Sequence, residues 1–278
     1  MSRIWFITGS SRGIGYEAAR AALAAGDRVA ATGRDLSALQ QRFAGTGTDR
    51  LLPLALDVAD SAAVQAAVDA TLAHFGRIDV LLNNAGYGQL GLFEEIGAEA
   101  TQRQFATNVF GLFDVTRAVL PAMRRQRSGR ILNITSVGGI IGVAGGGIYC
   151  AGKFAVEGFS EALAAEVEPF GIRVTIVGPG YFRTDFLDAS SIRHGEHAIA
   201  DYAEASRQLR NFFDGRNRQQ AGDPAKLGRV LVELAHHPAA PLRFSAGSDA
   251  VEVVRGKIAR LAWETDAFEA LSRSTDFA

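Results

Sequence analysis

The sequence is poor in cysteine and nearly balanced in charge. Its single cysteine, Cys150, excludes a disulfide within the chain and a zinc site built from several cysteines, and a reducing compartment is compatible with it. The 29 Lys and Arg residues against 30 Asp and Glu give a formal net charge of −1, and no basic run occurs. The charge therefore favours neither nucleic acid nor an anionic membrane, and we expect neither as a partner.

The usual signatures of targeting and membrane insertion are also missing. The first three residues lead directly into the apolar run 4–7, which leaves no room for a signal peptide. The long uncharged stretch 131–152 has the length of a membrane span, but polar residues and seven glycines interrupt it. We therefore expect no membrane span and a cytoplasmic location.

Two further kinds of site are disfavoured by what the sequence does not contain. No Gly-Lys-Ser/Thr follows a glycine-rich loop, so the spacing is not that of a phosphate-loop nucleoside triphosphatase. The histidines are scattered, with no His-Glu-x-x-His helix and no cysteine partner, and we therefore expect no metal site. The four that could suggest one are His194, His197, His236 and His237.

The remaining composition is that of a globular protein. The 278 residues are 47% hydrophobic and 21% charged, which allows one large α/β domain or two small ones. Short apolar runs of strand length alternate with longer amphipathic segments. Consecutive apolar residues are typical of strands buried on both faces, as in a parallel sheet. The runs are 4–8, 28–32, 51–56, 78–82, 130–135, 173–177 and 242–246.

The segments between these runs have helical spacing. They are 13–25, 60–75, 98–127 and 148–170, followed by a helix that starts at Asp223-Pro224 and a last one near 249–263. Alternating strands and helices imply right-handed crossovers. We therefore predict an α/β, doubly wound Rossmann fold: one domain, residues 1–278, with a parallel sheet of about seven strands and helices on both faces.

One stretch departs from this alternation. Residues 184–222 are polar and helix-prone, and their pattern predicts no strand. We interpret them as a helical insertion within the domain, packed over one end of the sheet as a lid on the substrate.

A glycine-rich turn follows the first strand and opens the first helix. Gly9 permits the tight turn, Gly13 lets backbone approach a pyrophosphate, and Gly15 lets the helix pack close to the strand. The helix N-terminus offers free N–H groups and the positive end of its dipole to phosphates. The strand before and the helix after favour dinucleotide binding over a structural turn. The other residues of the predicted binding loop are Ser11, Arg12 and Ile14.

The end of the second strand bears on the choice of nucleotide. An NAD-selective site usually has a carboxylate here for the ribose 2′-hydroxyl, and Gly33 stands about where that acid is expected. Arg34 follows and Arg12 lies in the first loop, so two guanidiniums favour a 2′-phosphate. We therefore favour NADP(H). Asp35 leaves NAD(H) possible, unless it only caps the next helix.

Three polar side chains carry the predicted chemistry. Tyr149 and Lys153 are four apart on a helix and therefore neighbours on one face. A nearby ammonium favours the phenolate and can lower the high pKa of a tyrosine, as a general acid/base at a carbonyl requires. Ser136 follows the fifth strand and can hydrogen-bond the substrate oxygen. Each of the three alone has a structural explanation, and their order on one scaffold is what favours catalysis.

These motifs together resemble the short-chain dehydrogenase/reductase family, strongly over about residues 3–183 and loosely beyond. The glycine spacing is similar to that of its dehydrogenase/reductase branch rather than its epimerase-like branch. The region 179–186 and the long C-terminal half are similar to hydroxysteroid and retinol dehydrogenases. The matching pieces are Thr8-Gly9-x-x-x-Gly13-x-Gly15, Asp57-Val58, Asn83-Asn84-Ala85-Gly86, Asn108, Ser136, Tyr149-x-x-x-Lys153 and Pro179-Gly180.

The resemblance implies a role for each matching position. Tyr149 would be the acid/base, Lys153 would lower its pKa and hold the nicotinamide ribose, and Ser136 would orient the substrate carbonyl. Asn108 would hold a water that links Lys153 to solvent, besides bonding backbone. Further cofactor contacts would come from Asp57 and Val58 at the adenine, Asn84, Ala85 and Gly86 at the adenosine ribose, and Pro179, Gly180 and Thr184 beside the nicotinamide. A homodimer or homotetramer, associating through helices 99–127 and 148–170, is expected by the same analogy.

The substrate implied is a small-molecule carbonyl or secondary alcohol on a mainly apolar body. A catalytically silent nucleotide sensor or scaffold on the same fold is the alternative, which the intact catalytic residues disfavour. Apolar residues of the loop after the fifth strand and of the lid would close the pocket, or would only pack the lid onto the sheet. They are Val137, Ile140, Ile141, Val143, Phe182, Phe186, Leu187, Tyr202, Leu209, Phe212 and Phe213.

Overall fold

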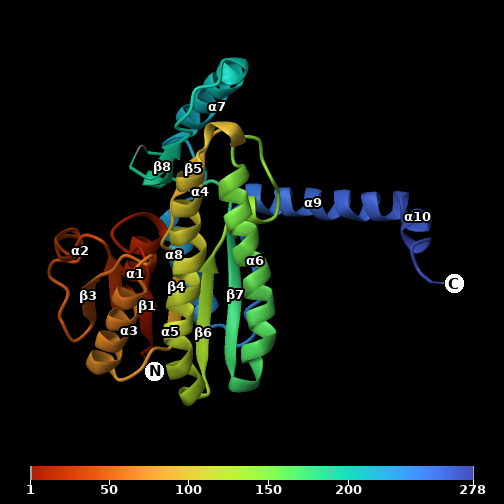
Figure 1. Ribbon diagram of the computed structural model, residues 1–278. Coiled ribbons are helices and arrows are strands. Elements are labelled where there is room, and N and C mark those ends of the chain that lie inside the picture. The colour runs from red at the N-terminus through yellow and green to blue at the C-terminus, as the bar shows by residue number, and fades with distance from the viewer. Residues whose placement is uncertain (1, 189, 278) are drawn as a thin grey trace.

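The computed structural model describes residues 2–188 and 190–277, and within them a seven-stranded parallel sheet carries helices on both faces (Figure 1). The strand order is β3-β2-β1-β4-β6-β7-β9. The bounds are β1 Ile4–Ile7, β2 Arg28–Gly33, β3 Leu51–Ala55, β4 Val80–Asn83, β6 Gly129–Ile134, β7 Ile172–Pro179 and β9 Arg243–Ala246. Every neighbouring pair is parallel, so the predicted doubly wound sheet is confirmed.

The central strands show why consecutive apolar residues are needed. Successive side chains of a strand point to opposite faces of the sheet. In β1, Trp5 and Ile7 enter the core on one face and Phe6 enters the core on the other, all three fully buried. Burial on both faces therefore explains the unbroken apolar run.

One face of the sheet is covered by α1 (Gly13–Ala24), α2 (Leu36–Arg42) and α8 (Pro224–His236). The side of α1 that faces the core is made of small residues, including Ala18 and Ala22. At Gly228 of α8 an added Cβ would lie 2.5 Å from the carbonyl oxygen of Glu17. The two helices therefore pack with backbone almost against backbone, which brings the C-terminal part of the chain onto the first helix.

The other face is covered by α3 (Ser61–Phe75), α5 (Gly111–Gln126) and α6 (Gly147–Val167). Asp60 caps α3 by accepting hydrogen bonds from the N–H groups of Ala62 and Ala63, and α3 ends at Gly76 with φ 81°. The predicted helix 98–127 is one helical stretch that contains a π-helical turn. Its parts are α4 (Ala98–Phe105), the π turn Ala106–Phe110 and α5.

The prediction that residues 184–222 contain no strand is wrong. β8 (Ile192–His194) pairs in parallel with β5 (Gly88–Leu90), which the sequence pattern also did not predict. Each strand is three residues long, and in β8 only Ile192 is buried, so no alternating pattern marks them. The helical part of the segment is α7 (Ala203–Arg216), which lies beyond the carboxyl ends of the large sheet (Figure 1).

The last helices leave the body of the protein. α9 (Ser248–Ala267) begins beside β9 and extends away from the sheet, and α10 (Glu269–Arg273) follows at its far end (Figure 1). Apolar side chains on this outer part are exposed, Trp263 to 67%. In the described part of the chain no helix is both long enough and apolar enough to cross a membrane.

Candidate active site

The carboxyl ends of β1 and β4 are joined by side-chain hydrogen bonds. The Oγ1 of Thr8 accepts hydrogen bonds from the backbone N–H groups of Asn84 (2.9 Å) and Ala85 (3.0 Å). The Nδ2 of Asn84 donates to the carbonyl oxygens of Thr8 and Gly9, both at 3.0 Å. These bonds fix the start of the loop between β1 and α1.

Residues 9–15 form what we call the glycine cradle. Gly9 and Gly13 have φ angles of 69° and 58°, which residues other than glycine rarely adopt. A Cβ on Gly15 would lie 2.4 Å from both the carbonyl oxygen of Gly9 and the Nδ2 of Asn84. The first turn of α1 has no side-chain cap and no acidic residue, so its free N–H groups suit an anion. The residues present therefore fit the pyrophosphate of a dinucleotide.

The end of β2 carries no acidic side chain, because residue 33 is a glycine that faces Ser11. A Cβ on Gly33 would lie 2.9 Å from the Oγ of Ser11. Asp35 is the N-cap of α2 and accepts a hydrogen bond from the N–H of Ala38 at 3.0 Å. Arg34 is exposed beside it. The capping role that the sequence left open for Asp35 is the one it has here.

Arg12 contacts the insertion 184–222. Its guanidinium donates to the Oγ of Ser190 at 2.7 Å and to the carbonyl oxygen of Ser190 at 3.1 Å. The methyl group of Thr184 would lie 3.6 Å from a Cβ on Gly13. The insertion therefore touches the cradle at its open side, a contact that the spacing of the sequence did not reveal.

The other predicted adenosine contacts lie along the same edge of the sheet. Asp57, after β3, is exposed and accepts a hydrogen bond from the N–H of Ala59, while Val58 is buried. A Cβ on Gly111 would lie 2.8 Å from Val58, so this valine packs against the start of α5. Gly86 is exposed after β4.

Asn108 lies in the π turn and is bonded to backbone. Its Nδ2 donates to the carbonyl oxygen of Tyr87 at 2.9 Å, and its Oδ1 accepts from the N–H of Tyr87 at 3.1 Å. Both bonds hold the segment between β4 and β5 against the helix. The structural role is thus present, and the water-holding role stays a prediction.

Ser136, Tyr149 and Lys153 meet where β6 ends and α6 begins. The Oγ of Ser136 accepts from the N–H of Gly138 at 3.1 Å, and Ser136 lies close enough to Tyr149 to influence its pKa. The Nζ of Lys153 donates to the carbonyl oxygen of Ile134 at 2.9 Å and lies 5.7 Å from the centroid of the Tyr149 ring. The structure therefore brings the three predicted residues together.

Burial dominates the protonation of this group. It raises the pKa of Tyr149, against the opposing effect of the Ser136 hydrogen bond, while Cys150 and Tyr181 raise it further. Burial lowers the pKa of Lys153 to about 8, and Glu157 acts against that change. Burial of the phenol therefore sets the direction of the Tyr149 shift, and the lowering expected from Lys153 stays a prediction. A protonated phenol that can donate a proton results.

On its other side Tyr149 is covered by apolar side chains, which we call the apolar cluster. Its buried members are Leu90, Leu187, Ile192 and Phe213, with Tyr149, Phe186 and Leu209 partly buried against them. The rings of Tyr149 and Phe186 are 5.7 Å apart. Four of the residues predicted to close the pocket therefore belong to it.

Other predicted pocket residues lie elsewhere. Phe212 is 45% exposed, with the guanidinium of Arg216 3.8 Å from its ring centroid. Tyr202 lies beside Glu94, which raises the pKa of its hydroxyl. Phe182 packs against the core beneath α1 and α8, so the packing explanation holds for it.

Two groups near the site were not predicted. Tyr181 follows the predicted Pro179-Gly180 and lies close enough to influence the pKa of Tyr149. Glu157 is four residues beyond Lys153, a spacing that could have identified it. Among the residues that the structure describes, no three His, Cys, Asp or Glu side chains are grouped to hold a metal ion.

Comparison with known proteins gives consistent similarity over nearly the whole chain. The family model described as short chain dehydrogenase matches residues 3–194. Oxidoreductase BOA17 of Botryotinia fuckeliana is 39% identical over 270 residues, 96% of each chain. The 3-ketodihydrosphingosine reductase of Bacteroides thetaiotaomicron is 38% identical over 245 residues, 88% of each chain. A crystal structure of a short-chain dehydrogenase from Streptomyces avermitilis has a TM-score of 0.91 and 39% identity, covering 100% of both chains.

Proposed function

The chain belongs to the short-chain dehydrogenase family of oxidoreductases, and on this premise we propose that it transfers hydride between NADP(H) and a carbonyl or secondary alcohol. The meeting of Ser136, Tyr149 and Lys153 at the carboxyl edge of the sheet, the edge at which the glycine cradle follows β1, carries this proposal. A scaffold that only bound nucleotide would need no acid/base at this place.

The residues act together on the substrate oxygen. Ser136 orients the carbonyl by a hydrogen bond, and the hydroxyl of Tyr149 gives its proton to that oxygen in reduction or takes it back in oxidation. The ammonium of Lys153 stabilises the phenolate that remains, and Asn108 holds the adjoining segment and a water. The nicotinamide, when bound, supplies or accepts the hydride.

The cofactor would be held along the carboxyl edge of the sheet. The glycine cradle binds the pyrophosphate, residues 57–58 and 84–86 border the adenosine, and Pro179, Gly180 and Thr184 flank the nicotinamide. Gly33, which supplies no carboxylate at this strand end, and Asp35, which caps α2, both support NADP(H). Arg34 is then the group that binds the 2′-phosphate.

A titration of nicotinamide fluorescence with NADPH and NADH tests this choice. We expect NADPH to bind tighter, and Arg34→Gln to weaken NADPH roughly five- to tenfold while leaving NADH unchanged, as one exposed charged contact allows. Arg125→Gln, an exposed arginine at the far end of α5, is the matched control. Tighter binding of NADH would assign the ribose to Asp35 and the cofactor to NAD(H).

The apolar side chains around Tyr149 support a substrate whose body is mainly apolar. The apolar cluster packs directly on Tyr149, so the segment 184–222 is proposed as a lid within the single domain 1–278. The relative from Bacteroides thetaiotaomicron is named for reduction of 3-ketodihydrosphingosine, a keto compound, which agrees with a ketone as substrate. Turnover of ketones with and without apolar substituents tests this preference.

We propose a homodimer or homotetramer in the cytoplasm. Phe110 at the start of α5 and Phe154 on α6 are 56% and 43% exposed, on the helices through which association is expected. Light scattering after size-exclusion chromatography measures the assembly, and a monomer would contradict it.

A further inference from the structure

Glu157 extends the row that Tyr149 and Lys153 begin on α6. The three residues are spaced by four, so they share one face of the helix. Glu157 is only 7% exposed, which is unusual for a carboxylate without partners. Its surroundings therefore need to compensate a buried charge.

Side chains of this row form hydrogen bonds with the end of β6 and with the residue after it. Lys153 bonds the carbonyl oxygen of Ile134, and the Oε1 of Glu157 accepts a hydrogen bond from the Oγ1 of Thr135 at 2.8 Å. Two successive residues, Ile134 and Thr135, are thus held by two successive turns of α6, and Thr135 is directly bonded to Ser136 in the chain. Ser136 in turn lies close enough to Tyr149 to influence its pKa.

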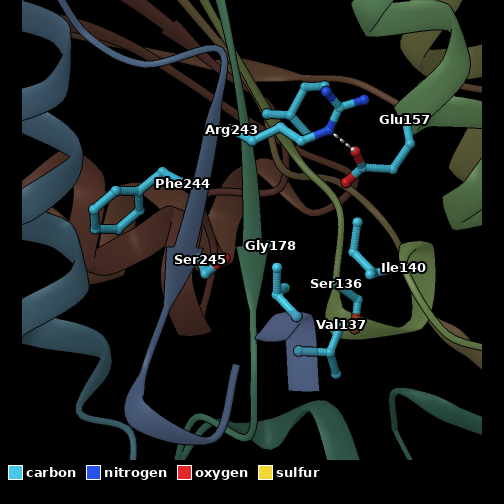
Figure 2. A pocket seen from close by; sticks show the side chains of 10 residues that line it. Ser136, Val137, Ile140, Glu157, Gly178, Arg243, Phe244 and Ser245 are labelled. Carbon is cyan, nitrogen blue, oxygen red and sulfur yellow. Dashed lines mark hydrogen bonds and ion pairs between the residues drawn. The ribbon is translucent and has the colours of Figure 1, made fainter. Parts of the chain in front are cut away.

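Arg243 of β9 closes the other side of Glu157 (Figure 2). Its Nε donates to Glu157 Oε2 at 3.2 Å, and its Nη2 donates to Glu161 Oε2 at 2.6 Å. Burial raises the pKa of Glu157, while the bonds from Thr135 and Arg243 act in the opposite direction and favour the carboxylate.

A cavity of about 50 Å³ adjoins these groups (Figure 2). Ser136, Glu157 and Arg243 line it together with mainly apolar residues. Since one water needs about 10–15 Å³ and two or more polar partners, the cavity has room for a few waters.

We propose that Glu157 is a positioning residue of the reaction, which fixes Ser136 through Thr135 and keeps Lys153 in its ammonium form. The role in catalysis rests on the proposed function, since Ser136 and Lys153 act only in that reaction. The electrostatic part does not, because the charge of Lys153 can be measured without a substrate.

Other charged and titratable groups face this row and have to be separated from Glu157. They are Tyr149, Cys150 and Glu161 on α6, Tyr181 after β7, Arg243 on β9 and Asp249 on α9. Glu161 is the natural control, because it binds the same arginine but is exposed and contacts neither Thr135 nor Lys153.

The chain has only three lysines, Lys153, Lys226 and Lys257, which makes a direct titration possible. Protein labelled with ¹³C at the lysine ε-carbon gives three signals, which Lys226→Arg and Lys257→Arg assign. In Glu157→Gln we expect the pKa of Lys153 to fall by roughly one pH unit, the effect of losing a nearby opposite charge. In Glu161→Gln we expect it to stay unchanged, and an unchanged value in Glu157→Gln would overturn the proposal.

The pH profile of ketone reduction gives the second readout. The decline of kcat/KM above the pKa of Lys153 is expected to move to lower pH in Glu157→Gln by the shift seen in the titration. In Glu157→Asp, which keeps the charge, the decline is expected to lie close to its position in the wild type. A loss of kcat that is equal at every pH would mean a merely structural role.

A failure of the proposed function can be distinguished from a failure of the proposal for Glu157. If the wild type reduced no ketone, the proposed function would fail while the titration still decided whether Glu157 controls Lys153. If Glu157→Gln did not fold, as judged by circular dichroism, Glu157→Met, which removes the charge without burying an amide, would replace it. The same fall of the Lys153 pKa is expected there, and an unchanged value would contradict the proposal.

Discussion

The glycine cradle after β1 and the apolar cluster packed on Tyr149 are held in different ways. The cradle is held by directed hydrogen bonds, such as those from Asn84 to the carbonyl oxygens of Thr8 and Gly9. The cluster is held by packing among side chains from β5, β8, α6 and α7. Directed bonds tolerate little change in geometry, whereas apolar packing adapts to volume. On the proposed function, the comparison predicts a fixed cofactor site and an adaptable substrate site.

The sharpest test of the rigidity of the glycine cradle is Gly15→Ala. The added Cβ would lie 2.4 Å from the Gly9 carbonyl oxygen, so we expect a loss of about 1–3 kcal/mol in the free energy of unfolding and at least tenfold weaker NADPH binding. Gly158→Ala is the control, because its Cβ meets nothing within 4 Å in α6 and should stabilise by up to about 1 kcal/mol. Urea unfolding and fluorescence titration measure both variants. Equal behaviour of the two would show that the cradle is adaptable as well.

The adaptability of the apolar cluster is tested by Leu209→Ala. Leu209 packs in the apolar cluster and touches Gly145, so its truncation should raise KM for an apolar ketone roughly tenfold and leave NADPH affinity unchanged. Phe212→Ala on the same helix, where the ring is half exposed, should change neither. An effect of Leu209→Ala on cofactor affinity rather than KM would mean that the glycine cradle and the apolar cluster are not separate.

The charge of Lys153 affects the free energy of unfolding, so its protonation can be followed by measuring stability against pH. Its pKa of about 8 in the folded protein is below the ordinary value of 10.5, so the unfolded chain binds more protons between these values. The free energy of unfolding should therefore rise with pH in that window, by about 1–2 kcal/mol between pH 7.5 and 9.5, relative to Lys153→Met. Urea unfolding at the two pH values measures the difference. A difference that does not change with pH would mean that the lysine pKa is ordinary.

The smallest effect is expected at the C-terminal end. Removing residues 259–278 takes away the part of α9 and α10 that extends from the body, so the free energy of unfolding should change by less than about 0.5 kcal/mol. Cofactor affinity should not change. Thermal unfolding at several protein concentrations measures this. A large loss would show that this arm contributes to an assembly.

The same contrast governs what the sequence could predict. Gly9, Gly13 and Gly15 stand at fixed spacing because the backbone of one short loop requires them, and the sheet follows from consecutive apolar residues. Tyr149 and Lys153 are likewise related by the turn of one helix. Such features depend on neighbours in sequence, and the structure brings them together as predicted.

Features that depend on distant residues were not predicted. β8 pairs with β5 over a separation of about a hundred residues, and Arg12 contacts Ser190. The short strands carry no periodic pattern, and the partner of an arginine cannot be read from its own segment. The direction of the Tyr149 pKa also depends on burial by the apolar cluster, which no local motif encodes.

The most direct measurement compares the wild type with Tyr149→Phe in NADPH-dependent reduction of a panel of ketones, with NADPH affinity measured by fluorescence. We expect turnover to fall roughly 10²- to 10⁴-fold, the usual contribution of a general acid, while NADPH binds with unchanged affinity. Turnover retained in Tyr149→Phe would contradict the assignment of the proton to this residue.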